Sequence, residues 1–272
     1  RRDPRLAETA DYLQNYAAAP VFGGTAVRYY PVGDVMLPDM LADLQAAQHS
    51  IFVESFIIGM GEMWGQIHEI LRQKAAAGLD VRVIYDDAGL LPHNYVDLLR
   101  ADGIRAFSFN RCVPVLNLVL NNRDHRKIMV VDGRIAYTGG VNLADEYINK
   151  VTRFGHWKDS GVRLEGPAAR SYANVFLTFW RAHFPNETSD YDKLLPQVAP
   201  VVPTGGTLVQ PFADSPVDRE VVAKNVYLEF INQALHSLRI CTPYLILDND
   251  LLTCLSLAAK RGVDVRIYTP GV

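Results

Sequence analysis

The feature that most constrains this chain is an internal repeat of a helix followed by a strand. Residues 41–58 and 228–247 both read as a helix, then His-Ser, then an apolar strand, and the two His-Ser pairs lie 187 positions apart. Residues 71–84 and 255–267 match again, through Gly-Leu-Asp-Val-Arg-Val and Gly-Val-Asp-Val-Arg-Ile, at an offset of 184. Two blocks at nearly the same offset predict two copies of one α/β unit, of which the second begins late in the chain.

Apolar periodicity and turn residues place the other elements of the first copy. We expect helices over 38–49, 63–77, 95–101 and 168–183, and strands over 51–58, 79–85, 104–109, 128–131, 135–138 and 161–164. Asp132-Gly133 lies between two of these strands and is typical of a tight hairpin turn. Because helices alternate with strands, we predict a mixed, mostly parallel sheet flanked by helices, with antiparallel pairing at this hairpin.

A stretch rich in proline and glycine separates the two copies. Residues 194–213 carry no charge but contain four prolines and two glycines, which favours a linker over a membrane helix. The chain therefore divides into four predicted segments. These are an N-terminal lead-in over 1–36, a first repeat over 37–185, a linker over 186–210, and the beginning of a second repeat over 211–272.

Composition excludes several classes of protein. The chain has 272 residues, which is long enough to bury a sizeable core, and its formal net charge is -3. That balance argues against a broad nucleic-acid-binding surface, although a local basic pocket stays possible. The three cysteines include no C-x-x-C spacing, so we expect neither a disulfide framework nor a zinc site.

The most informative residues lie in the strand before the hairpin. Side chains at i and i+2 of a strand point to the same face, so His125 and Lys127 project together and Arg126 projects to the other side. An imidazole is a nucleophile or a proton carrier near neutral pH. A lysine beside it is a point charge suited to a phosphoryl oxygen.

The residues after the hairpin extend this cluster. Gly139-Gly140 permits a close approach of the backbone to a ligand, and Asn142 adds a side-chain amide donor. Together these residues predict an anion pocket with a nucleophile and no metal. Glu54 lies within an apolar strand, where an unpaired carboxylate is costly, so we expect it to contact a basic group in or below the site. A purely structural role for Glu54 is equally open.

The pattern His-x-Lys-x4-Asp-x6-Gly-Gly-x-Asn over residues 125–142 resembles the HKD motif of the phospholipase D superfamily. Gly140 stands where that family usually has Ser, and Val119 where many relatives have a basic residue. The flanking stretches are similar to bacterial cardiolipin synthases; they are residues 116–128, 140–147, 156–168 and Thr242-Pro-Tyr-Leu, together with Glu54. The resemblance covers nearly the whole chain.

The resemblance implies a mechanism and a role for each residue. In such enzymes each half carries one motif, one histidine forms a phosphohistidine, and the other protonates the leaving alcohol, with no metal or cofactor. His125 resembles the nucleophile, while Lys127 and Asn142 resemble the phosphate clamp. Asp159 matches an acid that orients the histidine, although a surface or capping role stays open for it. Asp132 is expected to brace the hairpin and to take no part in the chemistry.

The resemblance also implies substrates and a location. A cardiolipin synthase transfers a phosphatidyl group from one phosphatidylglycerol to another and releases glycerol. We therefore expect a phospholipid substrate, a membrane surface as partner, association with a bacterial cell membrane, and possible homo-oligomers. Hydrolysis by water as in phospholipase D, a nuclease of the same superfamily, and a non-catalytic module are the alternatives. The residues 116–122 before the motif could line a lipid-facing lip or form an ordinary strand or loop.

The repeat offsets also locate the expected second motif. Added to 125, they place its histidine near 309 or 312, beyond Val272, and the chain opens without an initiator methionine. From this we expect an inactive fragment with half of an active site, with any membrane helices outside it.

Overall fold

The computed structural model describes residues 4–89, 91–92, 94–110, 123–153, 155–214 and 220–271. The stretch 116–122, with Val119, therefore lies outside the described residues. The chain forms two compact units. The larger unit spans residues 22–209, and the smaller combines residues 1–21 with 210–272.

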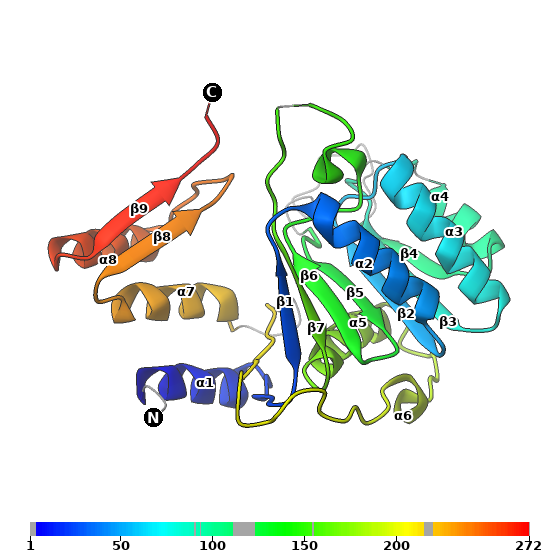
Figure 1. Cartoon of the computed structure of the whole chain (residues 1–272), viewed down its shortest axis with the longest axis horizontal. Coiled ribbons are helices and arrows are strands. Elements are labelled where there is room, and N and C mark those ends of the chain that lie inside the picture. Colours follow the sequence, from blue (N-terminus) through cyan, green and yellow to red (C-terminus); the bar gives the residue numbers. More distant parts are fainter. Residues whose placement is uncertain are drawn as a thin grey trace. The chain divides into compact units, whose positions relative to one another are not determined.

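The larger unit is built on a seven-stranded sheet (Figure 1). Its strands are β1 (Ala26–Tyr30), β2 (Ser50–Ser55), β3 (Asp80–Asp86), β4 (Arg105–Phe109), β5 (Lys127–Val131), β6 (Ile135–Gly139) and β7 (Gly161–Glu165). Its helices are α2 (Gly33–Ala46), α3 (Glu62–Ala76), α4 (Tyr95–Ala101), η2 (Asp145–Ile148), α5 (Ala169–His183) and α6 (Tyr191–Leu194). The α/β class, with a large mixed sheet flanked by helices, is confirmed.

The balance of strand directions in this sheet differs from the prediction. The strand order is β1-β7-β6-β5-β2-β3-β4. The pairs β2–β3 and β3–β4 are parallel, while the other four pairs of described strands are antiparallel. The expectation of a mostly parallel sheet was therefore wrong. Parallel neighbours need a helical crossover, which α3 and α4 supply, whereas β5 and β6 are joined by a tight turn that makes them antiparallel.

Helices cover both faces of the sheet (Figure 1). On one face, α2 and α3 bury a core that includes Leu44, Trp64 and Met129. On the other face, α5 packs Phe176 against Phe52 with 5.0 Å between ring centroids. Because side chains alternate along β5, the same strand supplies residues to both cores.

Two element boundaries differ from the sequence prediction. α2 begins at Gly33 and includes Pro38, where we had predicted a start. Pro38 is the sixth residue of α2, so the helix continues although the proline cannot donate the backbone hydrogen bond to the carbonyl of Asp34. β2 ends at Ser55 and not at residue 58. The Ser55 hydroxyl donates to the carbonyl of Ile57 at 2.9 Å, which turns the chain out of the strand direction.

The smaller unit contains the second copy of the repeat. It comprises α1 (Pro4–Tyr16), α7 (Val222–Gln233), β8 (Ser237–Cys241), α8 (Asn249–Lys260) and β9 (Asp264–Tyr268). β8 and β9 are parallel, and Ser237 pairs with Asp264. In the larger unit Ser50 of β2 pairs with Asp80 of β3, which is the same register at the two sequence offsets. The boundaries predicted at 36, 185 and 210 stay a prediction.

Candidate active site

The segment that carries His125 is anchored before β5 begins. Asp86, at the end of β3, has no exposed surface. Its carboxylate accepts the backbone N–H of Asp124 at 2.9 Å and pairs with Arg123 at 3.0 Å. The chain then enters β5, where Lys127 lies opposite Ser55 of β2. Residue 125 is therefore presented from a fixed backbone at the end of the sheet.

His125 and Lys127 meet beside an aromatic ring. The His125 side chain is exposed, and its ring lies 4.7 Å from the ring of Phe56. Lys127 is buried, and its Nζ donates to the His125 carbonyl at 2.6 Å. The same Nζ lies 5.3 Å from the centroid of Phe56. The structure thus places an accessible imidazole above a buried ammonium, as the strand alternation predicted.

The surroundings of these two groups change their pKa values. Desolvation and then the charge of Lys127 lower the pKa of His125, against the opposing effects of Asp124 and Asp86. Desolvation lowers the pKa of Lys127 to about 8, against the opposing charges of Asp124 and Asp159. At pH 7 the imidazole is therefore mostly neutral and the ammonium still charged. A neutral imidazole can attack phosphorus, and a neighbouring cation can stabilise the negative charge on its oxygens.

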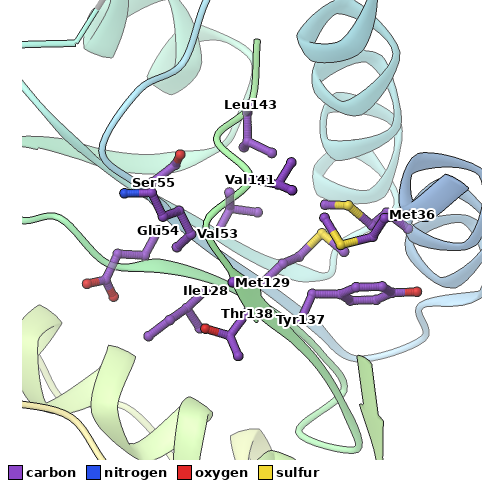
Figure 2. A pocket seen from close by; sticks show the side chains of 13 residues that line it. Met36, Val53, Glu54, Ser55, Ile128, Met129, Tyr137, Thr138, Val141 and Leu143 are labelled. Atoms are coloured by element: carbon purple, nitrogen blue, oxygen red, sulfur yellow. The ribbon is translucent and has the colours of Figure 1, made fainter. Parts of the chain in front are cut away.

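Lys127 borders a small cavity with a mostly apolar lining, and Figure 2 shows the side chains that line it. The cavity has a volume of about 20 Å³ and is lined by side chains that include Met36, Val53, Met129 and Val141. That volume has room for about one water molecule. An apolar lining hydrates the ammonium poorly, which is the physical cause of its lowered pKa.

Gly139, the last residue of β6, and Gly140 after it allow close approach within the site. Gly139 has φ 150°, and a Cβ there would collide with the carbonyl oxygen of Ser160. A Cβ on Gly140 would collide with the carboxylate of Asp159. The space that a side chain at 140 would occupy is therefore filled by Asp159. This packing accounts for glycine at the position where the resembled motif usually has Ser.

The charge of Asp159 acts on Lys127 rather than on His125. Its Oδ1 accepts the backbone N–H of Ser160 at 3.0 Å. Burial raises the pKa of its carboxyl, and the charge of Lys127 opposes that rise. The carboxylates that act on the pKa of His125 are instead Asp124 and Asp86. The role predicted for Asp159, orienting His125, stays a prediction.

Asn142 is buried and joins two segments that flank the site. Its Oδ1 accepts the backbone N–H of Ile57 at 3.0 Å, and its Nδ2 donates to the Tyr147 hydroxyl at 2.7 Å. The amide therefore ties the turn after β2 to η2. Both of these hydrogen bonds are to other residues of the protein, so the role of Asn142 as a phosphate clamp stays a prediction.

Glu54 is among the residues that line the cavity. In Figure 2 its carboxylate points away from Met36 and Met129. Arg126 Nε lies 2.7 Å from Glu54 Oε1 and 3.0 Å from Asp124 Oδ1. The basic partner that we expected for Glu54 is therefore Arg126. Sequence reasoning missed the part played by Asp124, although its place next to His125 was a signal.

Asp132 lies at the other end of β5, at the hairpin turn. Its carboxylate accepts the backbone N–H groups of Gln48, His49 and Ser50 at 2.9, 2.7 and 2.9 Å. These three residues lead into β2. The contacts agree with a bracing function, which extends from the hairpin to the neighbouring strand.

None of the helices in the described ranges is long and apolar enough to cross a membrane. In the same ranges, no three His, Cys, Asp or Glu side chains are grouped so that they could hold a metal ion.

Comparison with known sequences gives a consistent family. The family model described as cardiolipin synthase, PLD-like domain, matches residues 40–180. An uncharacterized protein of Streptococcus mutans is 42% identical over 98% of this chain and 58% of its own length. A cardiolipin synthase of Alkalihalophilus pseudofirmus is 36% identical over 85% of this chain and 46% of its own length. The chain thus spans about half the length of the curated relatives that it matches.

Comparison with solved structures supports the fold. The crystal structure of phosphatidylserine synthase from Haemophilus influenzae aligns with a TM-score of 0.66 and 15% sequence identity. The alignment covers 97% of this chain and 66% of that one. Together with the family match, this likeness confirms the phospholipase D-like α/β fold that the motif predicted.

Proposed function

This chain belongs to the family of cardiolipin synthase PLD-like domains, and from that membership we propose that it transfers phosphatidyl groups between phospholipids through a phosphohistidine on His125. The observation that carries the proposal is the accessible imidazole of His125, which is mostly neutral at pH 7, next to the buried ammonium of Lys127. The proposed donor and acceptor are two phosphatidylglycerols, and the products are cardiolipin and glycerol.

The first step forms the covalent intermediate. A ring nitrogen of His125 attacks the phosphorus of the donor lipid, and the bond from phosphorus to the glycerol oxygen breaks. Lys127 neutralises a non-bridging oxygen as negative charge develops. The leaving glycerol oxygen takes a proton, which the family resemblance assigns to the histidine of a second motif. Residues 1–272 carry one His-x-Lys-x4-Asp motif.

The second step releases the product. The hydroxyl of the acceptor lipid attacks the phosphorus while its proton returns to the same acid–base group. The bond from the His125 nitrogen to phosphorus breaks, and the neutral imidazole is restored. No redox step or metal is needed to balance either step. If water replaces the acceptor lipid, the same two steps give hydrolysis to phosphatidic acid.

The proposed substrates imply where the protein works. Phosphatidylglycerol is held in a bilayer, so we infer that the site meets a membrane surface and that the protein associates with the bacterial cell membrane. The exposed position of His125 at the end of the sheet suits a substrate that approaches from outside the fold. A homo-oligomer that brings two such motifs together is compatible with this proposal.

The test is product analysis with the protein as its gene encodes it. Vesicles of phosphatidylglycerol labelled in the headgroup glycerol would be incubated with the protein, and lipids and released glycerol would be quantified. Cardiolipin with an equal amount of free glycerol supports phosphatidyl transfer. Phosphatidic acid with glycerol identifies a hydrolase instead. Cleavage of single-stranded DNA at a comparable rate would overturn the lipid proposal.

A further inference from the structure

Two buried carboxyl groups and one cation lie directly behind the candidate nucleophile. Glu54 is 1% exposed and Asp124 is 5% exposed. Arg126 Nε contacts both, at 2.7 Å from Glu54 and 3.0 Å from Asp124. The guanidinium also lies 4.5 Å from the ring of Phe179 on α5, which closes that side. One cation therefore serves two carboxyl groups in a site that is largely closed to water.

The neighbouring charges do not supply the missing compensation. Asp86 is the next carboxylate, and it is already paired with Arg123 at 3.0 Å. Asp86 also accepts the backbone N–H groups of Asp124 and Ala88, at 2.9 and 2.8 Å. The charged groups facing Glu54 are thus Asp124 and Arg126, with Asp86 and Arg123 beyond them. Lys127 also interacts with Asp124, but it interacts with Asp159 as well. With these two groups included, four carboxyl groups face three cations, which leaves one negative charge in excess if all are ionised.

The unpartnered oxygens of Glu54 and Asp124 also indicate that the pair holds a proton. Among the described residues, both carboxyl oxygens of Glu54 and Oδ2 of Asp124 have no hydrogen-bond partner. The 2.7 Å contact of Arg126 with Glu54 Oε1 is an ion pair without hydrogen-bond geometry. An unpaired buried carboxylate is costly, whereas a protonated carboxyl can donate to its ionised neighbour. Burial raises the pKa of Glu54 well above its ordinary value, and the nearby Asp124 raises it further, while Arg126 lowers it. One proton would satisfy both the charge balance and the unpartnered oxygens.

We propose that Glu54 and Asp124 share one proton at neutral pH, and that this pair, bound to Arg126, is the support that orients His125. Asp124 and Arg126 flank His125 in the chain, and Arg126 joins Glu54 to Asp124. Glu54 is thus a positioning residue that acts on His125 through its neighbours. The catalytic part of this inference rests on the proposed function, whereas the shared proton does not.

The shared proton can be observed directly by infrared spectroscopy. An un-ionised carboxyl has a carbonyl stretch separate from that of carboxylates, so the wild-type chain at pH 7 should show this band. Glu54→Gln and Asp124→Asn should each abolish it, because each leaves one carboxylate paired with Arg126. Glu69→Gln, on the exposed surface of α3, is the matched control and should keep the band. Absence of the band from the wild-type chain would overturn the proposal without reference to any variant.

The pH dependence of stability gives a second readout. A carboxyl whose pKa is raised by folding contributes stability that is present below its unfolded value of 4.5 and is lost as the pH rises through the folded value. Glu54→Gln cannot ionise, so its unfolding midpoint should fall less than that of the wild type between pH 5 and the alkaline range. Parallel pH profiles of the two proteins would contradict a shared proton.

The positioning role is tested by comparing two substitutions of Glu54. A glutamine can accept from Arg126 and donate to Asp124, as the protonated acid does, whereas alanine can do neither. With phosphatidylglycerol, Glu54→Ala should lower kcat about tenfold or more at unchanged KM, and Glu54→Gln should lower it less. Equal activity of Glu54→Ala and wild type would refute the positioning role and leave the proposed function intact. Failure of wild-type transfer would refute the proposed function and leave the infrared result standing.

Discussion

The two ends of the β5–β6 hairpin carry acidic side chains that do different work. At the turn, Asp132 accepts three backbone N–H groups that lead into β2, and its contacts are all structural. At the open end, Asp124 acts on the pKa values of His125 and Lys127, and Asp159 acts on that of Lys127. One sequence motif thus contributes a structural residue at the turn and candidate active-site residues at the open end.

This division follows from the geometry of a strand. Each residue of a strand advances the chain by roughly 3.3 Å, so the seven positions from His125 to Asp132 span about 23 Å. His125 and Asp132 belong to the same motif, but they are too far apart along the strand to lie in one small site. Substitutions at the two ends should separate effects on activity from effects on stability.

The largest effect is expected from His125→Ala at the open end. If the imidazole forms the covalent intermediate, its loss should lower the rate of phosphatidyl transfer by about 10³-fold or more. Stability should change little because the side chain is exposed. The measurements are initial rates with phosphatidylglycerol vesicles and a denaturant melt. Turnover within a few-fold of wild type would refute the assigned role.

At the turn, Asp132→Ala should have the opposite profile. Loss of three hydrogen bonds to a carboxylate should lower the free energy of unfolding by about 2–3 kcal/mol. Activity per folded molecule should stay near that of the wild type. Asp34→Ala is a suitable control, because Asp34 accepts one local N–H, that of Val35, at 2.9 Å. If Asp132→Ala lowers the rate of phosphatidyl transfer without lowering stability, the structural role assigned to the turn is wrong.

Lys127 should make the open end sensitive to alkaline pH. Its pKa of about 8 predicts that transfer falls as the pH rises through 8, because the cation that stabilises the phosphoryl oxygens is lost. A lysine whose pKa is lowered by folding destabilises the fold below about pH 8, and stability recovers as the pH rises from there toward its unfolded value of 10.5. Lys127→Met should abolish that recovery in denaturant melts at a series of pH values. A wild-type midpoint that falls over this range, with no difference in Lys127→Met, would contradict the lowered pKa.

Gly140→Ser sharpens the comparison by disturbing the open end alone. The new Cβ would collide with the Asp159 carboxylate, so the carboxylate must move, and transfer should fall by about tenfold. In the double variant with Asp159→Ala, the loss should not exceed that of Asp159→Ala alone. Gly65→Ser is the matched control, because nothing lies within 4 Å of a Cβ there. Additive losses in the double variant would show that Gly140 acts independently of Asp159.

Much of the fold could be predicted because its signals are local. The helix over 95–101 and the hairpin at Asp132-Gly133 agree with the structure almost residue for residue. The predicted repeat is also reflected in the equal registers of β2–β3 and β8–β9. β1 was missed because its Val27 and Tyr29 are exposed, at 46% and 62%, so no buried apolar pattern marks the strand. Strand direction was misjudged because pairing depends on contacts between segments that are distant in sequence.

The sequence alone placed His125 and Lys127 on one face of a strand and Arg126 on the other, since alternation is a property of the backbone. Only the tertiary structure brought Glu54 to Arg126 across 72 positions of the chain and packed Asp159 into the space beside Gly140. It also decided which groups lose their hydration, and hence why the pKa of Lys127 is lowered to about 8. Desolvation and carboxylate pairing depend on which surfaces pack together, and a local pattern does not contain that information.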